Sequence, residues 1–168
     1  MSEREYRPEY GERLSEPGTI LFSSGSTGKP KAILHRLSAH LWNARGSNRN
    51  IPLNCGDRWL LSLPVYHVGG LAILFRCFEA GATVVPADPG QPLPNTLHPS
   101  LVTHLSLVST QLRRVLSAGK VLSNLKAVLL GGGPLPGGLV AEALQAGLPV
   151  YRTYGLTEMA SQVATGSR

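Results

Sequence analysis

The sequence predicts an α/β fold, in which a mixed sheet is flanked by helices. Short β-rich segments alternate with segments of helical periodicity along most of the chain. Gly81, Gly119 and Gly147 follow three of the helical segments, where glycine commonly ends a helix. The 168 residues are 42% hydrophobic and 15% charged, which is ordinary for one domain with a buried core.

Each element is predicted from its own pattern. Strands are expected at residues 19–23, 32–35, 59–63, 82–85, 104–108, 127–130 and 149–151. Helices are expected at residues 38–48, 70–79, 110–118 and 136–146. Pro136 at the start of the last helix and Gly147 just past its end fit the usual positions of these residues. Residues 86–99 contain five prolines, which predicts a surface connection.

The charges divide the chain into two parts. Residues 1–18 hold five glutamates, three arginines and two prolines, which predicts a flexible tail. Residues 19–168 carry 13 of the 16 basic residues and 5 of the 10 acidic ones, a net charge of +8. Such a surface attracts polyanions, including nucleotide triphosphates, coenzyme A and nucleic acids. Because no basic run interleaved with aromatic residues is present, we do not expect a nucleic-acid groove.

The cysteines and the apolar segments indicate the cellular compartment. Cys55 and Cys77 form no Cys-x-x-Cys pair, so neither a disulfide framework nor a zinc site is indicated, and we expect buried thiols. No signal peptide opens the chain, and its longest apolar stretch, residues 60–78, is interrupted by polar residues that include His67 and Arg76. These features predict a cytoplasmic protein without a membrane span.

The loop after the first predicted strand is suited to binding phosphate. Its residues are Ser23, Ser24, Gly25, Ser26, Thr27, Gly28, Lys29, Pro30 and Lys31. The two glycines allow consecutive N–H groups to converge on an anion, the hydroxyls add donors, and the lysines add charge. The spacing is not that of a Walker A loop, which needs glycine at 23 and a hydroxyl residue at 30. A flexible Gly/Ser turn is the alternative interpretation.

Two further loops follow predicted strands, where ligands collect in open α/β sheets. Gly131-Gly132-Gly133-Pro134 has little side-chain bulk, so a flat group could lie against its backbone; a tight helix-entry turn is the alternative. The segment from Tyr151 to Glu158 offers the aromatic face of Tyr154, the hydroxyl of Thr157 and the carboxylate of Glu158, an oxygen ligand suited to Mg²⁺. A solvated helix cap is the alternative for that glutamate.

A fourth candidate segment is Pro64-Val65-Tyr66-His67-Val68-Gly69-Gly70-Leu71. The glycines beside His67 leave room for a ligand, although a histidine among apolar residues is more often a hydrogen-bonded core residue. The other histidines, at 35, 40, 98 and 104, show no ligand spacing. No His-Glu-x-x-His, Gly-x-Ser-x-Gly or Gly-x-Gly-x-x-Gly motif occurs, which excludes zinc protease, serine hydrolase and Rossmann dehydrogenase interpretations.

These four segments, in this order, resemble the adenylate-forming superfamily of acyl-CoA ligases, luciferases and peptide-synthetase adenylation domains. The resemblance implies the fold of a large N-terminal AMP-binding domain, with ATP, Mg²⁺ and coenzyme A as cofactor and co-substrates. It implies that Lys31, Thr157 and Glu158 are catalytic, with Thr157 at the α-phosphate and Glu158 on the metal. The implied nucleotide-binding residues are Ser23, Ser24, Gly25, Ser26, Thr27, Gly28, Gly131, Gly132, Gly133, Pro134, Tyr154 and Gly155.

Within the superfamily, the segment 154–165 and the turn around His67 look most like the o-succinylbenzoate–CoA ligases of menaquinone or phylloquinone synthesis. This resemblance implies that His67 and Ser161 border the acyl substrate. Met159 and Ala32 depart from the threonine and glycine common at these positions. Ligases for other aryl or fatty acids therefore stay open.

The resemblance covers residues 19–165, whereas members of the superfamily are much longer. The ribose-binding aspartate, the hinge and the mobile C-terminal domain with its catalytic lysine have no counterpart in this sequence. We therefore expect reduced turnover, exposed edges, and either a homodimer or a complementing C-terminal domain. The alternative from another functional class is a non-catalytic nucleotide-binding or scaffold module.

Overall fold

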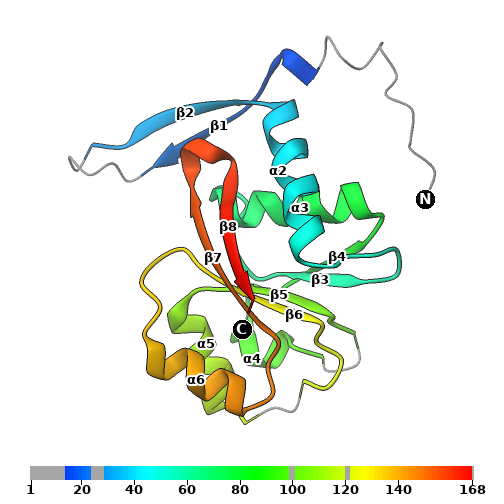
Figure 1. The fold of residues 1–168 in the computed structure, drawn as a ribbon, viewed down its shortest axis with the longest axis vertical. Helices are drawn as coiled ribbons and strands as arrows, with labels where there is room; N and C mark the ends of the chain where they lie inside the picture. Colours follow the sequence, from blue (N-terminus) through cyan, green and yellow to red (C-terminus); the bar gives the residue numbers. More distant parts are fainter. Residues whose placement is uncertain (1–13, 24–28, 99–100, 120–121, 168) are drawn as a thin grey trace.

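The computed structural model describes residues 14–23, 29–98, 101–119 and 122–167. Within them it contains one six-stranded sheet and one separate two-stranded sheet, as Figure 1 shows. The predicted α/β class with a mixed sheet flanked by helices is confirmed.

The large sheet has the strand order β4-β3-β5-β6-β7-β8. Its strands are β3 (Arg58–Leu61), β4 (Thr83–Pro86), β5 (His104–Leu107), β6 (Ala127–Leu130), β7 (Val150–Leu156) and β8 (Ser161–Ser167). Neighbouring strands from β4 to β7 are parallel, and β8 runs antiparallel to β7. The carboxyl ends of β3, β5, β6 and β7 therefore meet at one edge of the sheet.

Helices cover both faces of this sheet (Figure 1). On one face lie α2 (Leu37–Asn50) and α3 (Val68–Ala80), and on the other lie α4 (Leu93–Thr96), α5 (Ser109–Ser117) and α6 (Gly137–Gln145). Alternate residues of β6 show why this arrangement forms, because Ala127 and Leu129 pack with Ile73 of α3. Val128 and Leu130 point the other way and pack with Leu112 of α5. Both faces of β6 are thus removed from water, as is usual for parallel strands.

The two-stranded sheet is a hairpin of β1 (Pro17–Ser23) and β2 (Lys31–Arg36), and α2 follows β2 without a break. The hairpin is attached to the rest of the molecule through His40 of α2. The Nε2 atom of His40 lies 2.7 Å from the Thr19 hydroxyl of β1, and its ring stacks on Phe75 of α3 at 4.7 Å. Burial, followed by the nearby charge of His35, lowers the pKa of His40 to about 4, so the ring is neutral at pH 7.

The amino-terminal edge of the parallel strands is held by an ion pair. Asp57 directly precedes β3 and Lys126 directly precedes β6, and Lys126 Nζ lies 2.7 Å from Asp57 Oδ1. The backbone N–H of Asn54 donates to Asp57 Oδ2 at 2.9 Å. Burial alone would raise the pKa of Asp57, but the hydrogen bonds from Lys126 and Asn54 outweigh burial and lower it. Nearby, Nε2 of His104 lies 3.0 Å from the Pro52 carbonyl oxygen.

The last two strands differ from the prediction, whereas the other predicted strands and helices are confirmed with bounds that differ by at most two residues. Strand β7 continues to Leu156, past the predicted end at residue 151, and β8 was not predicted. The sequence of β8, Ser-Gln-Val-Ala-Thr-Gly-Ser, has no apolar run, and it is a strand because it pairs with β7. The connection between them is a 3₁₀ turn, η2 (Thr157–Met159).

Three smaller expectations are also wrong. Residues 86–99 are not a pure surface connection, because α4 lies within them and both Pro94 and Leu97 are buried. Cys77 is buried and free as expected, whereas Cys55 is free but exposed. Pro17 and Gly18 belong to β1, although the predicted tail ran to residue 18; residues 1–13 of that tail lie outside the described residues. In the described part of the chain, no helix has the length and hydrophobicity needed to cross a membrane.

Candidate functional site

The two ends of the predicted phosphate loop lie next to each other. Ser23 ends β1, Lys31 begins β2, and the two residues are paired in the hairpin. Both Lys31 and Lys29 are exposed. The central residues of the predicted loop, Ser24, Gly25, Ser26, Thr27 and Gly28, lie outside the described residues. The hairpin thus holds Ser23 and Lys31, the first and last residues of the predicted loop, side by side.

The glycine loop after β6 packs tightly against β7. A Cβ atom on Gly131 would overlap the hydroxyl oxygen of Thr153, and that hydroxyl donates to the Leu130 carbonyl oxygen at 3.2 Å. Gly132 has a φ of +77°, which lies in the left-handed region that favours glycine. Both interpretations of this loop therefore receive support, because the glycines allow close packing and also leave exposed backbone beside a cavity described below.

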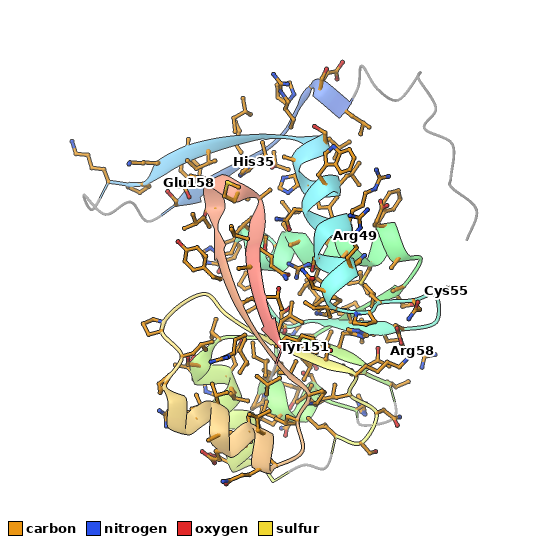
Figure 2. All side chains as sticks on the ribbon, viewed as in Figure 1. His35, Arg49, Cys55, Arg58, Tyr151 and Glu158 are labelled. Atoms are coloured by element: carbon orange, nitrogen blue, oxygen red, sulfur yellow. The ribbon has the colours of Figure 1, made fainter. Side chains whose placement is uncertain are left out.

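The Tyr-Gly-Leu-Thr-Glu segment forms the end of β7 and the turn that follows it. Figure 2 shows Glu158 in the turn between β7 and β8, close to the β1–β2 hairpin, which η2 contacts. Tyr154 is 61% exposed, so its ring is accessible to a ligand. A Cβ atom on Gly155 would overlap the Ser161 carbonyl oxygen, so glycine is required here for the contact between β7 and β8.

The His67 turn lies between β3 and α3. His67 is the residue before α3 and is exposed, with its ring 4.6 Å from that of Tyr66. A Cβ atom on Gly70 would overlap the Pro64 carbonyl oxygen, so this glycine allows the turn to fold back on the helix. His67 is consequently at the surface of a recess rather than in the core.

These segments surround one cavity of about 1100 Å³ at the carboxyl-terminal edge of the sheet. The hairpin contributes Ser23 and Lys31, and His67 lies on the wall formed by the turn before α3. The predicted site residues that line this cavity are Ser23, Lys31, His67, Gly132, Gly133, Tyr154, Gly155, Thr157 and Glu158. The structure therefore brings together parts of all four segments that the sequence singled out.

Three of the predicted site residues in the described ranges, Gly131, Pro134 and Ser161, do not line the large cavity. Gly131 lines an adjoining pocket instead of the large cavity. Pro134 is not among the residues that line either space, and its carbonyl oxygen accepts a hydrogen bond from the Ser109 hydroxyl at 2.8 Å. The structure thus places Pro134 as a contact between the glycine loop and α5.

The adjoining pocket has a volume of about 130 Å³ and contains a buried guanidinium group. It shares Leu63, Gly69 and Gly155 with the large cavity, so the two spaces lie side by side. Arg76 of α3 lies at this pocket and is only 3% exposed. Ser161, the second residue predicted to border the acyl substrate, lines the same pocket and is buried.

Arg76 has no carboxylate partner within the described ranges. Its Nη2 atom donates to Gln162 Oε1 at 3.1 Å and contacts the Ser161 hydroxyl at 3.5 Å, and its guanidinium lies over the ring of Trp59. Its Nε atom has no hydrogen-bond partner there. Burial lowers the pKa of Arg76 to about 10, so the group stays charged at neutral pH. An unpaired buried cation beside a cavity is suited to receive an anionic group of a ligand.

Sequence reasoning did not identify Arg76 as a site residue. The available signal was its position inside an apolar helical segment, where a buried arginine needs a partner. Asn43, which contacts the turn after Glu158, was also missed, and the polar sequence of α2 gave no signal for it.

The cavity fits Mg²⁺ bound together with phosphate groups. Glu158 supplies an exposed carboxylate, and no group of three His, Cys, Asp or Glu side chains suited to hold a metal occurs in the described ranges. Mg²⁺ is typically bound by one or two carboxylates, water and the phosphates of a nucleotide. One carboxylate opposite Lys31 is thus consistent with a metal that arrives with its nucleotide.

Curated proteins with similar sequences are CoA ligases. The 2-succinylbenzoate–CoA ligase of Bacillus mycoides is 40% identical over 157 residues, which are 90% of this chain and 33% of that protein. The corresponding ligase of Bacillus pumilus is 38% identical over 156 residues. The chain thus spans about a third of the length of the curated relatives it matches.

Solved structures show the same fold. One is the o-succinylbenzoate coenzyme A synthetase from Bacillus subtilis in complex with ATP and magnesium ion, which superposes with a TM-score of 0.84 at 34% identity. The match covers 92% of this chain and 33% of the synthetase. Another is wild-type E. coli MenE with a bound analogue of OSB-AMS, which superposes with a TM-score of 0.83 at 40% identity. That match covers 92% of this chain and 34% of MenE. The family model for AMP-binding enzymes matches residues 4–168, and the chain therefore belongs to the AMP-binding enzyme family.

Proposed function

We propose that this chain forms the ATP-binding and acid-binding face of an AMP-forming acid–CoA ligase whose acid is o-succinylbenzoate, in menaquinone or phylloquinone synthesis. One observation carries the proposal, which is that Lys31, Glu158 and Tyr154 line the same cavity as His67. The reaction needs a positive charge for the phosphates, a metal ligand, an aromatic surface for adenine and a recess for the acyl group. The named activity of the relatives supports the same conclusion.

The reaction has two steps. In the first, a carboxylate oxygen of the acid attacks the α-phosphorus of ATP, the bond to the β-phosphate oxygen breaks, and pyrophosphate leaves with the electron pair. In the second, the sulfur of coenzyme A attacks the acyl carbon, AMP leaves, and the thiol proton is released. Mg²⁺, when bound, neutralises phosphate charge.

The residues of this chain position the reactants for the first step. Lys31 offers a cation to the phosphates, and the Glu158 carboxylate provides a metal ligand at the mouth of the cavity. Tyr154 and the backbone of Gly132 and Gly133 provide surfaces for the adenine ring. Orienting the carboxylate and the α-phosphate in this way converts their encounter into a reaction within one complex.

Arg76 supports the identity of the acid. A ligand that lies along the wall bearing His67 reaches the adjoining pocket, where the unpaired guanidinium and the Ser161 hydroxyl can receive a second anionic group. o-Succinylbenzoate has two carboxylates, so one can react while the other binds Arg76. A fatty acid has no second carboxylate and would leave the cation unpaired, which makes it the weaker candidate.

Calorimetry with ATP and Mg²⁺ tests nucleotide binding, and pyrophosphate exchange driven by o-succinylbenzoate tests the first step. We expect Lys31→Ala and Glu158→Gln to weaken ATP·Mg²⁺ binding by about tenfold or more, since each removes a charged contact. Glu142→Gln, at an exposed position of α6, is the matched control and should bind as the unmodified chain does. Absence of ATP binding by the unmodified chain would refute the proposal, and binding without any exchange would favour the non-catalytic module.

An analogue of o-succinylbenzoate that lacks one carboxylate distinguishes acids with two carboxylates from acids with one. 3-Benzoylpropionate is o-succinylbenzoate without the ring carboxylate, and we expect it to drive exchange about 100-fold less well. Equal exchange with both acids would contradict the assignment of Arg76 and would reopen the other aryl acids. Exchange with a fatty acid alone would contradict the choice of substrate.

A further inference from the structure

Asn43, in the middle of α2, contacts the connection between β7 and β8 through both hydrogens of its side-chain amide. Its Nδ2 atom donates to the carbonyl oxygen of Met159 at 3.1 Å and to that of Gln162 at 2.8 Å. Because both acceptors are carbonyl oxygens, only the nitrogen of the amide can face them. The two acceptors enclose Ala160 and Ser161.

The enclosed residues have an unfavourable backbone. Ala160 has a φ of +55° and Ser161 a φ of +120°, and these are the non-glycine residues with positive φ in the described part of the chain. Side chains with a Cβ atom rarely adopt such angles unless the surroundings impose them. The contacts from Asn43 lie on either side of this pair, so they oppose relaxation of the turn.

The contacts leave the other half of the amide unpaired. Asn43 Oδ1 is buried and accepts no hydrogen bond from any residue that the structure describes. Buried polar atoms without partners are costly, so the two hydrogen bonds that Nδ2 donates are the contacts that hold the amide in this position. Asn43 thus stabilises the turn through Nδ2, while its Oδ1 atom has no hydrogen-bond partner among the described residues.

The turn in question carries Glu158, the residue directly before Met159. Asn43 belongs to the helix that continues from β2, and β2 begins at Lys31. The two strands of the hairpin also lie against the 157–159 turn. A single helix therefore connects the strand that begins at Lys31 with the turn that carries Glu158.

We propose that Asn43 is a positioning residue that fixes Glu158 relative to Lys31, so that the carboxylate is held ready for a metal-bound nucleotide. This inference rests on the proposed role of Glu158 as a metal ligand. Without the two hydrogen bonds, Ala160 and Ser161 relax and Glu158 becomes ordered only when the metal arrives. Residues that orient metal ligands in this way typically change metal affinity by about 10- to 100-fold when they are replaced.

The test is the gain in ATP affinity that Mg²⁺ provides, measured by calorimetry on the full 168-residue chain in Mg²⁺ and in EDTA. We expect Asn43→Leu, which removes both donors without adding charge, to reduce this gain by about tenfold while ATP affinity in EDTA stays the same. Asn43→Ser, which keeps one donor in a smaller side chain, should cause a smaller loss. Asn50→Leu, at the exposed end of the same helix, is the matched control and should retain the whole gain.

The double variant Asn43→Leu with Glu158→Gln identifies the route of the effect. If Asn43 acts through Glu158, the double variant loses no more of the Mg²⁺ gain than Glu158→Gln alone. Equal weakening of ATP binding in Mg²⁺ and in EDTA would indicate a purely structural role and overturn the inference, as would an unchanged gain in both Asn43 variants. Absence of any Mg²⁺ gain in the unmodified chain would refute the proposed metal role of Glu158, and this inference with it.

Discussion

The two edges of the parallel sheet place their polar residues in opposite situations. At the amino-terminal edge, the buried carboxylate of Asp57 has Lys126 and the Asn54 N–H as partners. At the carboxyl-terminal edge, the buried guanidinium of Arg76 has no carboxylate partner among the described residues, and Glu158 is exposed beside a cavity. The charged groups at the amino-terminal edge are paired within the chain, whereas those at the carboxyl-terminal edge are available to bind a ligand.

The difference shows how one sheet supports both stability and function. Polar groups that are fully paired within the protein contribute to the fold and have no capacity left for a substrate. Unpaired groups reduce stability and are retained where binding a ligand pairs them. We therefore expect substitutions at the amino-terminal edge to change stability alone, and substitutions at the carboxyl-terminal edge to change binding.

The largest effect is expected for Gly155→Ala. This substitution tests whether the close contact between β7 and β8 at the carboxyl-terminal edge is needed for stability. The new Cβ atom overlaps the Ser161 carbonyl oxygen, so the strands must separate, at a cost of about 3 kcal/mol in the free energy of unfolding. Urea denaturation measures this cost, and hydrogen exchange in β8 should show the same loss. An unchanged urea midpoint would mean that β8 can move without cost.

Arg76→Met tests the comparison directly, because it removes the unpaired cation. We expect affinity for o-succinylbenzoate to fall about 100-fold, while the free energy of unfolding stays the same or rises, since a buried charge without an ionic partner is replaced by an apolar side chain. Calorimetry and urea denaturation measure the two quantities. Arg49→Met, at an exposed position of α2, is the control. A large loss of stability with unchanged acid affinity would reverse the roles assigned to the two edges.

Asp57→Asn tests the opposite edge, and its effect depends on pH. The pKa of Asp57 is lower in the folded chain than the ordinary value of 3.8, so the ionised carboxylate adds stability above pH 3.8. That contribution is lost as the pH falls below 3.8 through the folded value. We expect Asp57→Asn to cost about 1–2 kcal/mol at pH 7 and less at pH 3, with ATP binding unchanged. Asp88→Asn, at an exposed aspartate of the loop after β4, is the control for the loss of stability at pH 7.

The smallest effect is expected for Gly46→Ala. This position lies away from both edges, so the variant shows how much stability changes when neither edge is altered. Gly46 lies on the exposed side of α2 and a Cβ atom there meets no atom within 4 Å. Replacing a helical glycine with alanine should raise the free energy of unfolding by about 1 kcal/mol, measured by urea denaturation. Binding of ATP and of the acid should not change. A loss of stability here would indicate that α2 is strained by its contacts with β8.

The sequence was sufficient where short motifs carry the prediction. Lys31, Tyr154 and Glu158 belong to segments that resemble those of one superfamily, which predicted that they would share a site, and all three line one cavity. Pro134, in contrast, was assigned to the nucleotide although Ser109 uses its carbonyl oxygen, a contact that local sequence does not reveal.

The residues that were missed depend on contacts between distant segments. Arg76 stood out only as an interruption of an apolar segment, and its importance depends on its burial without a carboxylate partner among the described residues. Asn43 acts on residues more than a hundred positions away, so no local pattern could indicate it. Strand β8 exists because β7 lies beside it, and its polar composition alone predicts no strand.

The separation of 119 positions between Asn43 and Gln162 also determines the order in which the molecule can be completed. Strands β3 to β6 can associate as soon as they emerge from the ribosome, since β4, β5 and β6 each pair with a strand already made. The helix that holds Asn43 must wait until residues 159 and 162 have been made before its carbonyl acceptors exist. A nascent chain that ends before residue 159 therefore carries a largely assembled scaffold without the finished turn that follows Glu158.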